Sequence, residues 1–135
     1  IAADQSVYTL GEIYEICCRR AADLIVLGVH EAGGLLGFRK AAAVAEAAGI
    51  NICLHGSFES GITTCAGNQI AATIPNLDDG NPNSRTLLNE DIVAAPDLVP
   101  AQGRLGVMQN PGLGFDLDQA AIGRAADRFK TLQNP

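Results

Sequence analysis

Short apolar runs alternate with helical segments over the first half of this sequence, and this alternation restricts the fold more than any other feature. Residues 24–29 and 50–54 are rich in Leu and β-branched side chains and too short for helices, as buried parallel strands are. Residues 73–77 form a weaker run containing Pro75, and residues 1–3 resemble the end of a strand. Strands separated by helices at roughly 25-residue spacing need right-handed crossovers and form parallel sheets. The sequence therefore predicts an α/β fold.

Three helices are expected between these strands, and each has a local sequence signal. A Thr-x-x-Glu capping box begins a helix over residues 9–21. An alanine-rich helix over residues 35–48 ends at Gly49, a residue that accepts a left-handed conformation. A third helix, over residues 61–72, is rich in small side chains that permit close packing on a sheet.

The second half of the chain is less regular. A short helix is expected over residues 86–93, and residues 96–114 are rich in Pro and Gly. Asp116 and Asp118 place negative charge at the start of a last helix, near residues 119–130. The apolar face of that helix is expected to contain Ala121, Ile122, Ala125 and Phe129.

Charge and composition exclude several classes of partner. The chain has 135 residues, 47% hydrophobic content and a formal net charge of -6, which argues against nucleic acid as a ligand. Only 4% of its residues are aromatic and none is Trp, so stacking platforms for bases are not favoured. The chain has no apolar run of about 18 residues and no basic leader, so neither membrane insertion nor export is predicted.

The cysteines indicate a reducing environment. No Cys-x-x-Cys pair is present, and each cysteine lies within or beside an apolar run, so buried free thiols are expected rather than disulfides or a zinc site. The four residues are Cys17, Cys18, Cys53 and Cys65. This pattern predicts a cytoplasmic protein.

Polar side chains fall at the ends of the predicted strands. They are Asp4, His30 close to Gly28, His55, and the pair Asp78 and Asp79. Ligands bind beyond the carboxyl ends of strands in parallel sheets and barrels, so these residues are candidates for one active site. The alternative for each is a structural role, because strand-end histidines are often solvated and aspartates cap helices and populate turns.

Several segments resemble one known family in their order and spacing. They are Ala-Asp-Gln-Ser at residues 3–6, Ala-Val-Ala-Glu-Ala-Ala-Gly-Ile at 43–50, Ser-Phe-Glu-Ser-Gly-Ile at 57–62, and Asn-Pro-Gly-Leu-Gly-Phe at 110–115. Together they resemble the C-terminal part of the enolase superfamily, specifically the mandelate racemase and muconate lactonizing enzyme group. The resemblance covers essentially the whole chain.

The resemblance implies the C-terminal portion of a (β/α)7β TIM-type barrel. Residues 1–95 would form the C-terminal half of the barrel, and residues 96–135 an irregular tail and a helix that packs on the barrel or capping region. In this family, carboxylates on the third, fourth and fifth strands bind Mg²⁺ (or Mn²⁺), and Asp4 matches the fifth-strand ligand. The ion stabilises the enediolate formed when a small carboxylate substrate loses its α-proton. A homo-oligomer is also expected.

The sequence departs from the family pattern at the sixth strand. Lactonizing enzymes have a catalytic lysine, and mandelate racemases an Asp, at the position of Gly28. His55 matches the racemase histidine by its spacing to Glu59, but the orienting Asp of that pair is absent. His30, two residues after Gly28, lies on the same face of the strand and is a candidate to replace the missing side chain. Gln5 stands where the lactonizing branch usually has Glu.

These residues lead to three hypotheses about function. The first is an isomerase, with catalytic residues His55, His30 and Asp78, metal ligand Asp4, and substrate-binding residues Gly28, Glu59 and Asp79. The second is a dehydratase in which His55 or His30 acts as the acid, because Gly28 leaves one side of the substrate without a base. The third is a half-barrel folding unit without catalysis, whose open sheet edges need a partner. The 135-residue piece alone is expected to be inactive.

Overall fold

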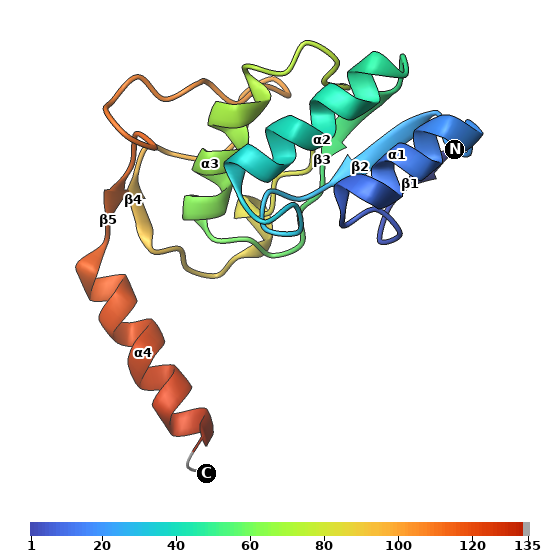
Figure 1. Ribbon diagram of the computed structural model, residues 1–135. Coiled ribbons are helices and arrows are strands. Elements are labelled where there is room, and N and C mark those ends of the chain that lie inside the picture. Colours follow the sequence, from blue (N-terminus) through green and yellow to red (C-terminus); the bar gives the residue numbers. More distant parts are fainter. Residues whose placement is uncertain (134–135) are drawn as a thin grey trace.

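Three short parallel strands form the main sheet of the protein (Figure 1). The computed structural model describes residues 1–133, in which β1 (Ala2–Ala3), β2 (Leu24–Leu27) and β3 (Asn51–Leu54) pair in that order. A helix follows each strand, as the alternating pattern predicts. The carboxyl ends of the three strands therefore lie at one edge of the sheet.

The predicted strand over residues 73–77 is wrong. That segment contributes only a single parallel bridge, between Leu77 and Ile52 of β3. Pro75 has no N–H for a ladder, and the residues before it are held by the end of the preceding helix, where the N–H of Ile74 donates to the carbonyl of Ala71. Leu77 therefore continues the sheet for one position only.

The three predicted helices are confirmed, with bounds one or two residues shorter. They are α1 (Leu10–Arg19), α2 (Leu35–Ala47) and α3 (Gly61–Ala71). The capping box is formed: the Thr9 hydroxyl accepts from the N–H of Glu12 at 3.2 Å, and the Glu12 carboxylate accepts from the N–H of Thr9 at 2.8 Å. Gly49 adopts a φ of +70° just after α2, the left-handed conformation that glycine accepts most easily.

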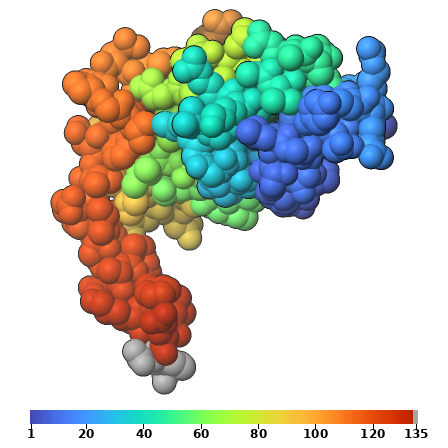
Figure 2. Space-filling view, in the orientation of Figure 1, coloured from blue at the N-terminus to red at the C-terminus, as the bar shows by residue number. Residues whose placement is uncertain are grey.

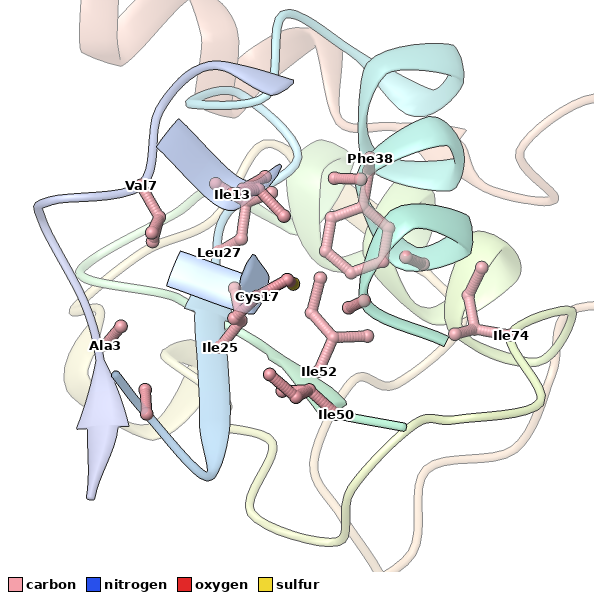
Figure 3. Close-up of a cluster of buried hydrophobic side chains, with 14 of the residues drawn as sticks. Ala3, Val7, Ile13, Cys17, Ile25, Leu27, Phe38, Ile50, Ile52 and Ile74 are labelled. Atoms are coloured by element: carbon pink, nitrogen blue, oxygen red, sulfur yellow. The ribbon is translucent and has the colours of Figure 1, made fainter. Parts of the chain in front are cut away.

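The main core lies between the sheet and helices α1 and α2 (Figure 3). Ile25 and Leu27 of β2 and Ile52 of β3 point toward Ile13 and Phe38, and all five are fully buried. Burying a side chain as large as Phe38 stabilises the fold by about 1.5–3 kcal/mol. The alternate residues of β2, Leu24 and Val26, face the other way and are only partly buried. This packing fixes the strands, and with them the positions of the residues at their ends.

The cysteine prediction is confirmed at three of the four positions. Cys17, Cys53 and Cys65 are buried free thiols, and burial raises the pKa of each. Cys18 is also free but exposed, so the prediction of burial is wrong there. Neighbouring residues on a helix point in directions about 100° apart, and Cys18 follows Cys17 onto the solvent side of α1.

The predicted helix over residues 86–93 is also wrong. A single 3₁₀ turn, η1 (Arg85–Leu87), is followed by β4 (Val93–Ala95), which pairs antiparallel with β5 (Asp116–Leu117). A local sequence pattern cannot indicate this pairing, because its two strands lie more than twenty residues apart. A second apolar cluster joins Cys65 of α3 to Leu98 and Met108 of the tail, residues 96–135.

The last helix, α4 (Gln119–Gln133), extends away from the rest of the molecule (Figures 1 and 2). Asp118 caps it by accepting from the N–H of Ala121 at 2.9 Å. Of the predicted apolar face only Ala121 is buried, whereas Phe129 is 60% exposed. The packing of this helix on a barrel or capping region, and the division at residue 95, stay predictions. Among residues 1–133, no helix has both the length and the apolar character needed to cross a membrane.

Candidate functional site

The candidate site lies at the carboxyl ends of the three strands. Asp4 directly follows β1, Gly28 follows β2, and His55 follows β3. The N–H of His55 donates to the carbonyl of Leu27 at 3.0 Å, so the β2–β3 ladder continues to this residue and fixes its backbone. Because the strands are parallel, the three positions meet at one edge, as the sequence predicts.

The imidazole of His55 lies between two carboxylates. Its Nε2 is 4.0 Å from Oδ1 of Asp4, and its Nδ1 is 3.0 Å from Oε1 of Glu31. The side chain of His55 is only 19% exposed. Nδ1 is buried and lies within hydrogen-bond distance of Glu31, but the geometry of the two groups does not meet the requirements of a hydrogen bond. Catalytic hydrogen bonds are often poorly aligned before substrate binds.

Glu31 is a residue of this site that its position in the sequence did not predict. Its side chain is 12% exposed, and its Oε2 accepts from the N–H of Gly28 at 2.7 Å. The turn is closed by further bonds, including one from the N–H of Ala32 to the carbonyl of Gly28 at 3.0 Å. A carboxylate three residues after a strand-end glycine was a visible signal, but the backbone of the turn decides where it points.

Gly28 makes room for this arrangement. A Cβ at that position would lie 2.8 Å from Cε1 of His30 and 2.9 Å from Oε2 of Glu31. Distances under 3.0 Å are shorter than real Cβ contacts, so a side chain here would displace one of its neighbours. The volume that a longer residue would fill is therefore occupied by His30 and Glu31.

Glu59 and His30 form a second, looser pair. Nδ1 of His30 is 4.0 Å from Oε1 of Glu59, and the hydroxyl of Ser84 donates to Oε2 of Glu59 at 3.0 Å. Burial by itself raises the pKa of Glu59. Hydrogen bonds from the N–H groups of Ser57 and Glu59 and from the Ser84 hydroxyl, together with the charge of His30, outweigh it, so the pKa lies below its usual 4.5.

Ser84 joins this carboxylate to the turn after β3. Its side chain is buried, with a relative exposure of 5% for the residue, and its oxygen also accepts from the N–H of Phe58 at 3.1 Å. Phe58 has a φ of 62°, a conformation that costs free energy for a bulky residue. The Ser84 hydroxyl therefore holds the turn of His55 and Glu59 in a conformation that it would not favour alone.

Replacing Ser84 with Ala should destabilise the protein by about 1–3 kcal/mol, because the N–H of Phe58 and the carboxylate of Glu59 both lose a partner. Glu59 stabilises the fold fully above its unfolded pKa, and this contribution is lost as the pH falls through the lower folded pKa. Loss of the Ser84 bond raises the folded pKa, so the decline of stability on the acid side should become shallower. Urea unfolding between pH 3 and pH 7 measures both effects.

The control is Ser57→Ala, because the side chain of Ser57 is exposed and the substitution retains its backbone N–H. Equal stability of Ser84→Ala and Ser57→Ala would contradict this role of the hydroxyl.

The two remaining predicted site residues lie in different places. Oδ2 of Asp78 accepts from the side chain of Asn51 at 3.1 Å, and Asn51 is the first residue of β3, at the opposite end from His55. Asp79 lines a cavity of about 210 Å³ together with His55 and Glu59. The structure therefore brings Asp79 to the site and does not bring Asp78 there. Their chemical roles stay predictions.

The described residues do not form a complete metal site. Among residues 1–133, no group of three or more His, Cys, Asp or Glu side chains is arranged to hold a metal ion. Asp4 offers one carboxylate at the strand end; its side chain is 45% exposed, and its Oδ1 accepts from the N–H of Gln5 at 2.8 Å. Oxygen ligands of this kind suit Mg²⁺. Asp4 thus fits as one ligand of a site that needs further residues to complete it.

Comparison with known sequences identifies the family. The profile of the Enolase C-terminal domain-like family matches residues 1–121. The chain belongs to this family, in the mandelate racemase and muconate lactonizing enzyme group of the enolase superfamily. The family and the barrel fold predicted from the sequence are thereby confirmed.

The relatives of the chain are enzymes of several reaction types. Muconate cycloisomerase 1 of Rhodococcus opacus is 35% identical over 124 residues, which is 90% of this chain and 33% of that enzyme. An enzyme of Streptomyces coelicolor named as a probable glucarate dehydratase is 29% identical over 122 residues, 90% of this chain and 28% of its own. The structure of a dipeptide epimerase from Methylococcus capsulatus complexed with Mg ion superposes with a TM-score of 0.79 at 27% identity, covering 87% of this chain and 34% of that one. The chain spans about a third of the length of the curated relatives that it matches.

Proposed function

We propose that this chain is part of a Mg²⁺-dependent enzyme that removes the proton next to a substrate carboxylate, with His55 as its acid–base group. The observation that carries the proposal is the position of the His55 imidazole, 4.0 Å from Asp4, at the carboxyl ends of β3 and β1, the two parallel strands on either side of β2. An imidazole changes its charge near neutral pH and is suited to proton transfer. The three enzyme relatives support this class of chemistry.

Two of the described residues have distinct roles in this reaction. His55 accepts the α-proton as the C–H bond breaks, and the electron pair moves toward the carboxylate to give an enediolate. Asp4 is one oxygen ligand of the metal, whose positive charge would stabilise the negative charge that develops on the substrate. Asn81 and Asn83 also line the cavity beside His55 and Glu59. Their side-chain NH₂ groups each donate one hydrogen bond within the protein, to the carbonyls of Asp78 and Leu98, and each has a second N–H.

Isomerisation is the leading reaction, because the muconate cycloisomerase and the dipeptide epimerase are both isomerases by name. In this reaction a proton is returned to the enediolate. The structure gives a specific reason to keep dehydration as a second candidate: Gly28 carries no side chain and its space is filled, so the sixth-strand base of the family has no direct replacement. His55 would then protonate the departing hydroxyl, which leaves as water. Mn²⁺ in place of Mg²⁺, a homo-oligomer and a cytoplasmic location also stay predictions.

Replacing Asp4 with Asn should weaken Mg²⁺ binding to the intact protein by about 10-fold or more, because the site loses an anionic oxygen ligand. Even the loss of a residue that only hydrogen-bonds to a metal ligand lowers metal affinity by about 10–100-fold. Calorimetric titration with Mg²⁺ measures the affinity. The matched control is Asp127→Asn, an exposed carboxylate on α4 paired with Lys130. Wild-type affinity and activity in the Asp4 variant would contradict the assignment of Asp4 as a metal ligand.

A further inference from the structure

The loops that follow β2 and β3 are joined by two histidine–carboxylate pairs. The loop after β2 carries His30 and Glu31, and the turn after β3 carries His55 and Glu59. Each loop supplies a histidine to the carboxylate of the other, at 3.0 Å for Glu31 with His55 and 4.0 Å for Glu59 with His30. The tighter pair is also the more buried, since His30 is 54% exposed. The Glu31–His55 pair is therefore the better defined of the two.

The carboxylate of Glu31 is itself held in a fixed orientation. Its Oε2 accepts from the backbone N–H of Gly28 at 2.7 Å, and this donor belongs to the residue directly after β2. Its Oε1 is then directed to Nδ1 of His55. An ionised carboxylate only accepts hydrogen bonds, so the neutral imidazole beside it is favoured with its proton on Nδ1.

We propose that Glu31 is a positioning residue that keeps the proton of neutral His55 on Nδ1 and leaves Nε2 unprotonated toward Asp4. The inference deepens the proposed function and rests on it, because Nε2 is then the atom that takes the substrate proton. Gly28 contributes by being a glycine, since a Cβ there would lie 2.9 Å from Oε2 of Glu31. The chain thus replaces a side chain at the strand end with a carboxylate from the following turn.

Glu31→Gln tests the inference without changing the size of the side chain. The N–H of Gly28 requires an acceptor, so it should bind the amide oxygen of the new residue, and the amide NH₂ would then face Nδ1 of His55. A donor at that place favours the opposite form, with the proton on Nε2. The position of the proton is read from ¹⁵N chemical shifts of the imidazoles in the intact protein, in a pH series carried up to the range where these shifts no longer change and the rings are neutral.

The expected result is Nδ1–H in the wild type and predominantly Nε2–H in Glu31→Gln. The sequence has only two histidines, so His30→Gln assigns the signals. Glu46→Gln, which removes an exposed carboxylate on α2, is the matched control and should retain Nδ1–H. The same form of His55 in the wild type and in Glu31→Gln would overturn the inference.

Gly28→Ala separates the position of Glu31 from its charge. The new methyl group should displace both the ring of His30 and the carboxylate of Glu31, which are ends of side chains, while the fold is retained. We expect the preference for Nδ1–H to be lost and kcat to fall by roughly 10-fold or more with little change in KM, because Glu31 does not touch the substrate. A wild-type NMR signature in folded Gly28→Ala would contradict the inference. The NMR result does not depend on activity, so an inactive protein with the expected signature would refute the proposed function alone.

Discussion

Replacing His55 with Asn should lower turnover by roughly 10²- to 10⁴-fold, the usual contribution of a positioned proton donor or acceptor. Asn retains a polar group of similar reach but cannot exchange a proton near neutral pH. The imidazole is 19% exposed and lies between Asp4 and Glu31, so another side chain or a water molecule would not easily take its place. Steady-state kinetics of the intact enzyme, measured as kcat and KM, would show the loss in kcat.

His30→Asn is the comparison for this variant, because His30 lies in the same loop cluster but is 54% exposed and 4.0 Å from its carboxylate. We expect kcat of His30→Asn to fall by less than about 10-fold, because an exposed side chain at the edge of the site does not transfer a proton. An equal loss in both variants would show that both imidazoles exchange protons. Wild-type turnover in His55→Asn would mean that His55 only lines the pocket.

Gly37→Ala should be the most destabilising single methyl addition on the described chain. Gly37 lies in the first turns of α2, and a Cβ there would be 1.8 Å from the carbonyl oxygen of Ala32. That oxygen belongs to the backbone and cannot rotate away like a side chain. The turn carrying Glu31 or the start of α2 must move, and we expect a cost of about 3 kcal/mol, at the upper end for overpacked sites.

The matched control is Gly123→Ala in α4, where no atom lies within 4 Å of the added Cβ. Ala is favoured over Gly in a helix interior by about 0.5–1 kcal/mol, so this variant should be slightly more stable than the wild type. Urea unfolding midpoints compare the two. Equal midpoints for Gly37→Ala and the wild type would show that the approach of α2 to the turn is not a constraint.

The regular half of the fold was predictable because its signals are local. Apolar runs, the capping box at Thr9 and the terminating Gly49 depend on residues close in sequence, and the structure contains all of them. The elements after α3 were not predictable in this way. Strands β4 and β5 each depend on a partner distant in sequence, and the run before Leu77 contains Pro75, which cannot donate to a ladder.

The candidate site was predictable to the extent that it lies at strand ends. Asp4 and His55 follow their strands directly, and parallel pairing brings them to 4.0 Å. Glu31 was missed because its direction is set by the turn after β2 and by the N–H of Gly28, which the sequence does not show. Asp78 also follows a predicted strand, but only Leu77 pairs with β3, and Asp78 therefore lies beside Asn51.

The most direct test of the proposed function is proton exchange in D₂O. The intact protein is incubated with Mg²⁺ and with muconate, glucarate or a dipeptide as probes, chosen from the names of its relatives. Deuterium at the carbon next to the carboxylate is measured by NMR in substrate and product. We predict incorporation with at least one probe that is abolished by chelation of the metal and falls by roughly 10²-fold or more in His55→Asn. Incorporation that persists without metal and at the same rate in His55→Asn would contradict the proposed function.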